Sequence, residues 1–328
     1  MILDVLYIII GIVLVLVGAD RLTEGASALA RRFGVPEIVI GLTIVACGTS
    51  APEFFVSLMS ALNGTPDMAV GNVVGSNIMN SMLIVGCAAM VAPMVISPST
   101  VKKDIPFSVG ASVLLVLLAI DSTVSRIDGI ILLVGFAAFM AYTLYQAKGG
   151  ESKVEGGRLK VEGGGRIPEG QEQISFNPPP STLHHILWIL LGLAGLVFGS
   201  NLFVDSASSV AALLGVSESV IGLTIVAGGT SLPELATSVV AARKGQSAIA
   251  IGNVIGSNVF NILLILGATA AISPLQMEGI TLVDIGVMLA SITLVWLFSF
   301  TRYTVERWEG ALLVLGFLGY LGWLLYQV

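Results

Sequence analysis

The chain has 328 residues, of which 55% are hydrophobic and only 11% are charged, and its mean hydropathy is +0.95. These values exclude an ordinary soluble globular protein and indicate an integral membrane protein built of helices. The net charge of −6, without any cluster of basic residues, argues against a nucleic-acid partner, so the expected surroundings are the lipid bilayer.

Ten apolar segments follow one another along the chain, and most are close to the length of a membrane-spanning helix. The first begins at Ile2 and lacks both a basic start and a small-residue cleavage site, so we interpret it as a retained span rather than a signal peptide. The two cysteines, Cys47 and Cys87, fall inside apolar segments and are interpreted as packing residues rather than a disulfide. The predicted spans are residues 2–20, 36–61, 69–91, 104–121, 127–146, 183–204, 216–242, 248–271, 281–300 and 307–327.

The sequence contains an internal repeat. Residues 222–267 align with residues 41–86 without a gap at an offset of 181, and 25 of the 46 positions are identical. We therefore divide the chain into a first five-helix repeat (1–147), a flexible linker rich in Gly and Pro (148–182) and a second five-helix repeat (183–328). Because five is an odd number of spans, the second repeat must insert upside down relative to the first, as in many secondary transporters. The predicted fold class is an all-α integral membrane protein whose ten transmembrane helices form two inverted five-helix repeats.

The basic residues predict the orientation in the membrane. With the N-terminus outside, 14 of the 15 Lys and Arg residues lie on the inner side, and only Arg126 lies outside. This distribution satisfies the positive-inside rule. We therefore expect a multi-pass protein of the cell (plasma or inner) membrane, with both termini outside and a cytoplasmic linker.

Each repeat carries one carboxylate in an otherwise apolar run, Glu53 and Glu234, which stand 181 positions apart. Carboxylates are costly inside a membrane and indicate a function there. Pro52 and Pro233 come directly before them, so a break or kink is predicted in each helix just before its glutamate. Carboxylates beside freed backbone carbonyls are typical ligands of hard cations such as Ca²⁺ or Na⁺.

Further polar side chains recur every fourth residue in the third and eighth spans. Hydroxyl and amide oxygens of this kind suit cations coordinated by oxygen and argue against zinc, copper or iron. The same residue types also serve as hydrogen bonds between membrane helices, and the sequence leaves this alternative open for each of them. The residues are Asn72, Ser76 and Asn80, with the counterparts Asn253, Ser257 and Asn261.

The motifs GTSAPE and GNVVGSN in the first copy, and GTSLPE and GNVIGSN in the second, resemble the two alpha-repeats of the sodium/calcium exchanger family, within the cation/calcium exchanger superfamily. The compact size and short linker are similar to those of prokaryotic members. The resemblance implies a secondary active antiporter, not an enzyme, that exchanges sodium (in) for calcium (out) by alternating access at a midplane site between the repeats. It implies no cofactor beyond the transported Ca²⁺ and Na⁺, and we expect a functional monomer.

Position by position, the resemblance implies a central calcium site made of Glu53, Glu234 and the backbone carbonyls of Thr49 and Thr230. The flanking sodium sites would use Ala46, Ser50, Ser76, Ala227, Ser231 and Ser257, while Asn80 and Asn261 would line the middle. Some relatives, including potassium-dependent ones, carry Asp where this chain has Asn261, so we expect transport without potassium.

Several alternatives stay open at this point. Protonated carboxylates could replace sodium, which would make the protein a proton/calcium exchanger, and a potassium-dependent sodium/calcium exchanger is a related possibility. An intramembrane aspartyl protease would need paired aspartates in their own motif. A passive channel is disfavoured because paired acidic sites hold divalent ions too tightly for fast flux. For an exchanger, we expect the smooth, apolar first and sixth spans to slide against a fixed site.

Overall fold

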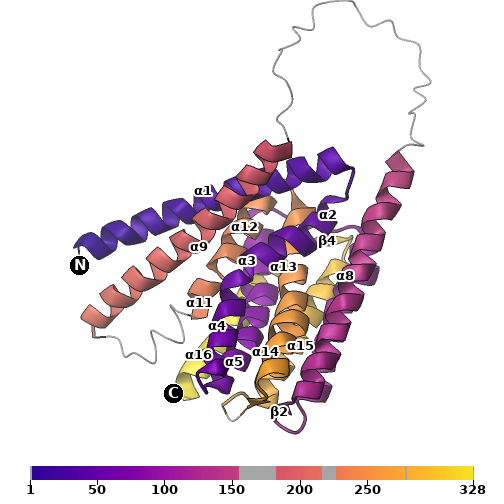
Figure 1. Cartoon of the computed structure of the whole chain (residues 1–328). Helices are drawn as coiled ribbons and strands as arrows, with labels where there is room; N and C mark the ends of the chain where they lie inside the picture. Colours follow the sequence, from indigo (N-terminus) through magenta and orange to yellow (C-terminus); the bar gives the residue numbers. More distant parts are fainter. Residues whose placement is uncertain (1, 155–181, 216–226, 278, 328) are drawn as a thin grey trace, which may run out of the picture.

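The structure is a computed structural model that describes residues 2–154, 182–215, 227–277 and 279–327. It is almost entirely helical (Figure 1). In the first half of the chain the helices are α1 (Ile2–Phe33), α2 (Glu37–Ile40), α3 (Ala46–Thr49), α4 (Ala51–Leu62), α5 (Pro66–Ile78), α6 (Val85–Val91), α7 (Ile105–Leu118) and α8 (Arg126–Val154), with the π-helical turns η1 (Gly41–Val45), η2 (Met79–Ile84) and η3 (Thr100–Asp104). In the second half they are α9 (Thr182–Leu213), α11 (Ala227–Thr230), α12 (Leu232–Arg243), α13 (Ser247–Val259), the π-helical turn η5 (Phe260–Leu266), α14 (Gly267–Ile272), α15 (Leu282–Ser299) and α16 (Arg307–Gln327).

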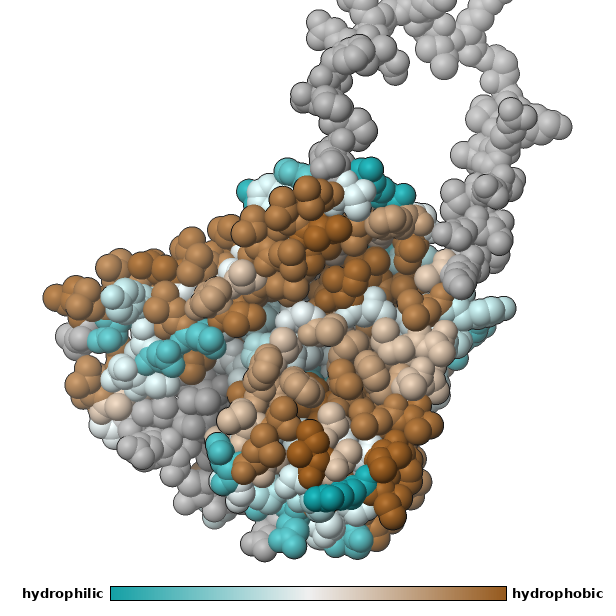
Figure 2. Space-filling model, in the orientation of Figure 1, coloured by the Kyte–Doolittle hydropathy of each residue, from teal (hydrophilic) through white to brown (hydrophobic). Residues whose placement is uncertain are grey.

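Within the described residues, 7 helices are long and apolar enough to cross a membrane, or 8 if the bent pair Glu37–Thr49 and Ala51–Leu62 counts as one span. Two of the ten predicted spans are not among them: 104–121, which corresponds to the 14-residue helix α7, and 216–242, which is described only from Ala227. Figure 2 shows a surface dominated by apolar residues, with hydrophilic residues gathered towards its edges. So much exposed apolar surface requires lipid around it, which makes this a multi-pass membrane protein.

Two long helices, α1 and α9, lie side by side and cross the rest of the bundle obliquely (Figure 1). They approach each other closely because glycines face each other along the contact. A Cβ placed on Gly18 would lie 2.7 Å from the carbonyl oxygen of Gly192, and one on Gly11 would lie 2.8 Å from that of Gly199. The pair therefore packs backbone against backbone, without room for larger side chains.

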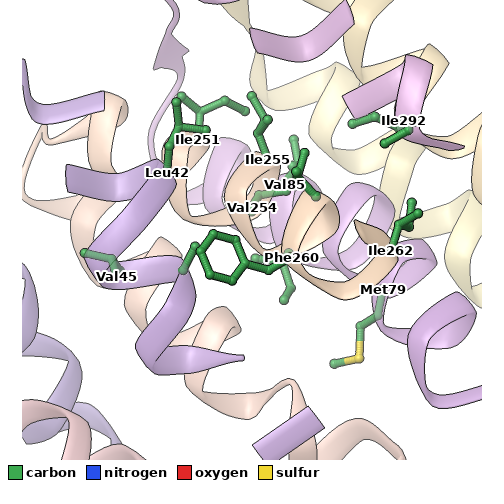
Figure 3. Packing of buried hydrophobic residues seen from close by; sticks show 14 of the residues in the cluster. Leu42, Val45, Met79, Val85, Ile251, Val254, Ile255, Phe260, Ile262 and Ile292 are labelled. Carbon is green, nitrogen blue, oxygen red and sulfur yellow. The ribbon is translucent and has the colours of Figure 1, made fainter. Parts of the chain in front are cut away.

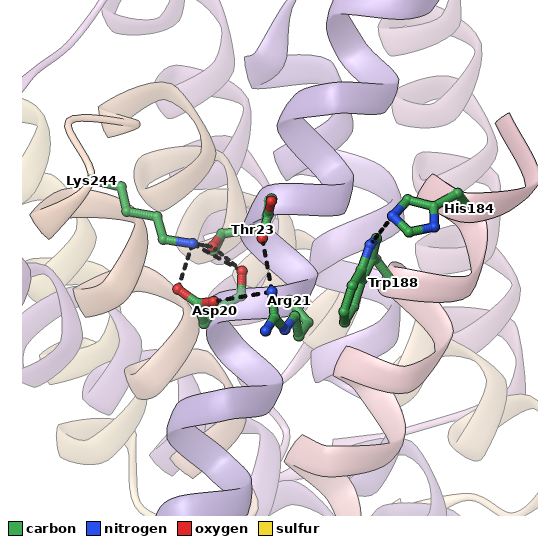
Figure 4. Close-up of polar contacts among 7 residues, drawn as sticks. Asp20, Arg21, Thr23, His184, Trp188 and Lys244 are labelled. Atoms are coloured by element: carbon green, nitrogen blue, oxygen red, sulfur yellow. Dashed lines mark hydrogen bonds and ion pairs between the residues drawn. The ribbon is translucent and has the colours of Figure 1, made fainter. Parts of the chain in front are cut away.

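Polar contacts of residues in the middle of α1 join it to both of its neighbours (Figure 4). The Lys244 ammonium, just after α12, lies 2.7 Å from an Asp20 carboxylate oxygen and donates to the Thr23 hydroxyl at 3.2 Å. On the other side of α1, the Arg21 guanidinium lies 4.2 Å from the ring centre of Trp188 on α9. These contacts join α1 to both the bundle and α9.

The centre of the bundle is α13 with η5, and almost all of its side chains are buried. Leu42 of η1 lies beside Ile251 of α13 in the apolar core, and Val45, Val254 and Ile255 belong to the same cluster (Figure 3). The backbones also meet here, because a Cβ on Gly256 would lie 2.8 Å from the Leu42 carbonyl oxygen. The segment leading to Glu53 is thus packed directly on the second half of the chain.

Four two-residue strands join the halves at opposite ends of the bundle (Figure 1). Strand β1 (Met94–Val95) pairs antiparallel with β4 (Thr304–Val305), and β2 (Thr123–Val124) pairs antiparallel with β3 (Leu275–Gln276). Adding the 181-residue offset to β1 and β2 gives β3 and β4, so the second pair repeats the first with the halves exchanged. The fold therefore carries an internal two-fold relation that matches the sequence repeat.

The predicted linker is only partly described. Helix α8 continues to Val154 and so includes the first seven residues of the predicted linker, 148–154, and α9 begins at Thr182. Residues 155–181 of the predicted linker lie outside the described part of the chain, as do residues 216–226 in the predicted seventh span.

Candidate cation site

Each half of the chain has a broken helix where the sequence predicts one. Helix α3 ends at Thr49, α4 begins at Ala51, and the two segments are bent by 47°. Ser50 stands between them with non-helical angles (φ −84°, ψ 6°). In the second half Ser231 has nearly the same angles (φ −90°, ψ 7°) between α11 and α12. The predicted breaks are confirmed, and in each the proline stands at the start of the new helix, where its missing N–H costs little.

The two glutamates lie in the first turns of α4 and α12, and each residue is only 1% exposed. A helix N-terminus favours a negative charge, so the breaks place each carboxylate where the backbone helps to stabilise it. The Ser231 hydroxyl donates to Glu53 Oε1 at 3.2 Å, and the Ser50 hydroxyl donates to Glu234 Oε1 at 3.0 Å. Each glutamate is therefore bound by the hinge serine of the opposite half.

Four buried oxygens at the centre accept no hydrogen bond from any described residue. They are Glu53 Oε2, Glu234 Oε2, Asn80 Oδ1 and Asn261 Oδ1, and they form two pairs at the 181-residue offset. None of the ion pairs in the described part of the chain includes either glutamate. Buried acceptors without donors are rare, and bound ions are one of the explanations for them. Carboxylate and amide oxygens are the ligands that Ca²⁺ and other hard cations prefer.

The two central asparagines are held by two further asparagines that the sequence analysis does not single out. The Asn80 side chain donates to Asn258 Oδ1 at 3.1 Å, and the Asn261 side chain donates to Asn77 Oδ1 at 3.0 Å. These bonds fix the orientation of each amide, and neither Oδ1 accepts a hydrogen bond from a described residue. Asn77 and Asn258 are identical residues of the quoted GSN motifs, and that identity was the signal available in the sequence.

Asn72 and Asn253 have a structural task. The Asn72 side chain donates to the Glu53 carbonyl oxygen at 3.1 Å and to the Ser57 hydroxyl at 2.8 Å. Asn253 makes the corresponding bonds to the Glu234 carbonyl at 3.3 Å and to Ser238 at 3.0 Å. For these two residues the structure therefore shows the hydrogen bonds between helices that the alternative describes.

The other predicted site residues lie around the glutamates. Ser257 donates to Glu234 Oε1 at 3.4 Å, and Ser76 is 3.2 Å from the Ser231 hydroxyl. The buried Thr49 hydroxyl donates to Asn253 Oδ1 at 3.0 Å. Three more residues take their places in the hinge segments: Ala46 begins α3 and its carbonyl accepts the Ser50 N–H at 3.0 Å, Ala227 begins α11, and Thr230 ends α11 next to Ser231.

A cavity of about 290 Å³ borders this site. It is lined by Asn72, Ser76 and Gly228 and by apolar or aromatic residues that include Met79 and Tyr320. At the two-fold related place the chain has Phe260 and Phe139 instead of Met79 and Tyr320, and both are buried. The Phe260 ring also packs edge-on against Phe136, 5.0 Å between centres. A cavity therefore borders the site on the side of Met79 and Tyr320, and buried phenylalanines stand at the two-fold related positions.

The chain matches the family model described as "Sodium/calcium exchanger protein" over residues 3–145 and 184–326. It is 36% identical over 324 residues to the putative antiporter CaxA of Alkalimonas amylolytica, covering 98% of each chain. It is 33% identical over 343 residues to the sodium/calcium exchanger MaX1 of Methanosarcina acetivorans, again covering 98% of each. A solved structure of the sodium-calcium exchanger NCX_Mj matches with a TM-score of 0.82 and 31% identity, covering 98% of this chain and 99% of that one.

These relatives are transporters and not enzymes, and the family match spans both halves that carry the broken helices and their glutamates. The chain belongs to the sodium/calcium exchanger family of membrane antiporters.

Proposed function

We propose that this protein exchanges sodium (in) for calcium (out) by alternating access at a site between two inverted five-helix repeats, residues 1–147 and 183–328. In this proposal ten helices cross the cell membrane, both termini lie outside, the linker 148–182 is cytoplasmic, and the monomer is the working unit. The observation that carries the proposal is the set of four buried oxygens without donors, on Glu53, Glu234, Asn80 and Asn261. Two carboxylates and two amides are a suitable ligand set for Ca²⁺.

We assign the ion ligands as follows. Glu53 and Glu234, with the backbone carbonyls of Thr49 and Thr230, hold Ca²⁺ at the centre, and Asn80 and Asn261 line the middle. The flanking sodium ions use oxygens of Ala46, Ser50, Ser76, Ala227, Ser231 and Ser257. The crossed bonds between hinge serines and glutamates support this assignment, because they keep one oxygen of each carboxylate fixed and the other free.

The charge of the site explains coupled exchange. Two carboxylates about 5 Å apart repel by roughly 3 kcal/mol at an effective dielectric constant near 20. Burial adds to this cost, so the doubly charged site is unfavourable without cations. One Ca²⁺ neutralises the pair, and so do monovalent ions in sufficient number. If the protein changes conformation readily only when the site is neutralised, entry of sodium is coupled to exit of calcium, and the two ions compete for the same carboxylates.

The conformational change is assigned to α1 and α9. They are packed together by glycines and lie obliquely on the bundle, so they are suited to move as a pair against a fixed site. The cavity beside Met79 and the aromatic packing of Phe136 and Phe260 at the two-fold related place support a cycle in which the two sides of the site open in turn.

The proposal is tested by calcium uptake into proteoliposomes under an imposed sodium gradient, with potassium and pH varied separately. Sodium-driven uptake that needs neither potassium nor a proton gradient is expected. Uptake that follows an imposed pH gradient without sodium would instead identify a proton/calcium exchanger, and a strict need for potassium would identify the potassium-dependent type. Additive binding of sodium and calcium in calorimetry would contradict the shared site.

A further inference from the structure

A second polar cavity, of about 310 Å³, lies among α2, the segment between β1 and η3, α8 and α13. It is separate from the glutamate site, and neither Glu53 nor Glu234 lines it. Its wall has a few apolar residues, but six lining side chains carry oxygen atoms, and no basic side chain lines it. The six are Glu37, Ser97, Ser99, Thr100, Asp104 and Gln146.

Asp104 is the residue that needs an explanation. It is 1% exposed, and its Oδ1 accepts a hydrogen bond from the Gln146 side chain at 3.1 Å. Its Oδ2 is buried and has no hydrogen-bond partner among the described residues. The two-fold related position in the second half is Ile285, which is also 1% exposed. Because the related half has an apolar residue at this position, the fold does not require the carboxylate of Asp104.

Further hydroxyl oxygens lie near Asp104. The hydroxyls of Ser97 and Thr100 are 3.0 Å apart, and Thr100 begins the π-helical turn that ends in Asp104. The hydroxyl of Tyr142, one turn before Gln146 on α8, is buried and also lacks a hydrogen-bond partner in the described structure. Buried polar atoms left in this way indicate a missing ion or ordered water.

Among the described residues, the buried Asp104 carboxylate makes no ion pair, and the one nearby charge that acts on it belongs to the exposed Lys103. Glu37 is more exposed, accepts a hydrogen bond from Ser27 and lies 3.7 Å from the Arg31 guanidinium, whose side chain is 67% exposed. Lys102 and Lys103 lie on the same turn as Asp104 but are exposed and do not line the cavity. Of the two acids, Glu37 therefore already has a basic partner, while Asp104 makes no ion pair with any described residue.

We propose that this cavity is a second, non-transporting cation site, with Asp104 as its anchoring ligand and Ca²⁺ as its preferred ion. Carboxylate, hydroxyl and amide oxygens are hard ligands, and Ca²⁺ accepts six to eight of them with variable geometry. The volume exceeds that of a bare ion and has room for on the order of ten water molecules at about 30 Å³ each, so the ion enters with part of its hydration shell.

The position of the site suggests what binding would do. Glu37 opens α2, which continues through η1 and α3 to the hinge at Ser50. An ion held between Asp104 and the wall formed by α2 would fix the start of the segment that leads to the hinge at Ser50 and, beyond it, to Glu53 on α4. Occupancy is therefore expected to regulate the transport site rather than to add to the transported charge.

The test uses the full-length purified protein and radioactive calcium in equilibrium dialysis. Glu53→Gln and Glu234→Gln are combined to silence the transport site, and this double variant is expected to keep one saturable calcium site. Adding Asp104→Asn, which preserves an acceptor for Gln146, should weaken that site at least about tenfold. Asp121→Asn, which changes an exposed acid in the same background, is the matched control and should leave binding unchanged.

Two results would overturn the inference: no calcium binding to the double variant at millimolar concentration, or binding that Asp104→Asn leaves unchanged. If Asp104→Asn fails to fold, Thr100→Val removes one ligand without changing the charge and should also weaken binding. Competition by sodium but not by choline fits a hard-cation site, whereas binding of sodium without calcium would refute calcium as the preferred ion. Because the measurement is binding in a background without the transport glutamates, its failure would leave the proposed exchange untouched.

Discussion

Glu53 and Glu234 owe their importance to what surrounds them. Each has one oxygen fixed by a serine of the opposite half and one oxygen without a donor among the described residues. A glutamine at either position keeps the shape but lacks the charge. The remaining carboxylate cannot balance a divalent ion that has lost its water.

We therefore predict that Glu53→Gln or Glu234→Gln lowers sodium-driven calcium transport at least about 100-fold, which corresponds to roughly 3 kcal/mol. The measurement is calcium uptake into proteoliposomes. Glu24→Gln is the control, because Glu24 pairs with Arg21 at the surface and its loss should change transport little. Robust sodium-driven calcium flux in the double glutamine variant would refute the site assignment.

Asn261 provides a second residue-level prediction. Its amide oxygen is a neutral ligand, so the central cavity carries only the two glutamate charges. Asn261→Asp would add a third carboxylate and with it a place for one more monovalent ion or a proton. We predict that the unmodified protein works without potassium and that this variant becomes more sensitive to potassium or pH.

The measurement is exchange with potassium replaced on both sides by a large inert cation. Asn72→Asp is a useful comparison, because Asn72 donates hydrogen bonds that an aspartate cannot make, and we expect this variant to lose stability rather than to gain potassium dependence. If the unmodified protein loses activity without potassium, the residue at position 261 does not distinguish potassium-dependent from potassium-independent exchangers.

At this scale the breaks before the two glutamates could be predicted from the sequence, and the residues that form hydrogen bonds around them only in part. Charge in an apolar run and its exact recurrence were visible without a structure. A spacing of four residues, as in a regular α-helix, selects Asn72, Ser76 and Asn80 and passes over Asn77. In the second half it passes over Asn258 in the same way. The π-helical turn η2 begins at Met79 and changes that count, so residues that stand apart in the regular pattern meet across the halves.

Among the elements, α1 and α9 differ most from their sequence-based bounds. The predicted spans 2–20 and 183–204 become Ile2–Phe33 and Thr182–Leu213. The apolar run indicates how far a helix is compatible with lipid, whereas the helix itself continues through residues such as Leu, Ala, Glu and Arg, which favour helix. Their close contact was equally hidden, because facing glycines belong to different halves.

This contact leads to a prediction for Gly192. A Cβ there would lie 2.6 Å from the Leu22 backbone nitrogen, so alanine must push the two helices apart. We expect Gly192→Ala to destabilise the protein by about 1–3 kcal/mol, measured as a lower melting temperature in detergent. Gly110→Ala in α7 is the matched control, since nothing lies within 4 Å of a Cβ at that position. Equal melting temperatures for the two variants would contradict the tight packing of α1 on α9.

For the whole molecule, the distribution of basic residues predicts which side of the membrane each loop faces. A cysteine at Gly157, in the predicted linker and outside the described residues, should not react with impermeant thiol reagents added to intact cells. The two native cysteines would first be replaced, with Cys47→Gly copying the residue found at 228. A cysteine at Asp121, in the predicted outer loop, is the positive control. Labelling at 157 from outside would overturn the proposed orientation.

The repeat itself was predictable at this scale, because 25 identical positions in 46 are visible in the sequence alone. The way the halves fit together was not. No local pattern in the sequence encodes contacts between distant parts of the chain. Examples are the pairing of Met94 with Val305 and the packing of η1 against Gly256. The ten-span count remains a prediction, since part of the predicted seventh span lies outside the described residues.

The exchanged strand pairs have a consequence for how the protein is made. Strands β1 and β2 are synthesised in the first half, yet their partners β4 and β3 belong to the second. The hinge serine that binds Glu53 also arrives only with the second half. Until the second half has been translated, the first half therefore lies in the membrane with unpaired strands and with Glu53 lacking its serine partner. Each half alone therefore lacks contacts of the native fold. If the two halves are encoded separately, they should accumulate only when a cell produces both.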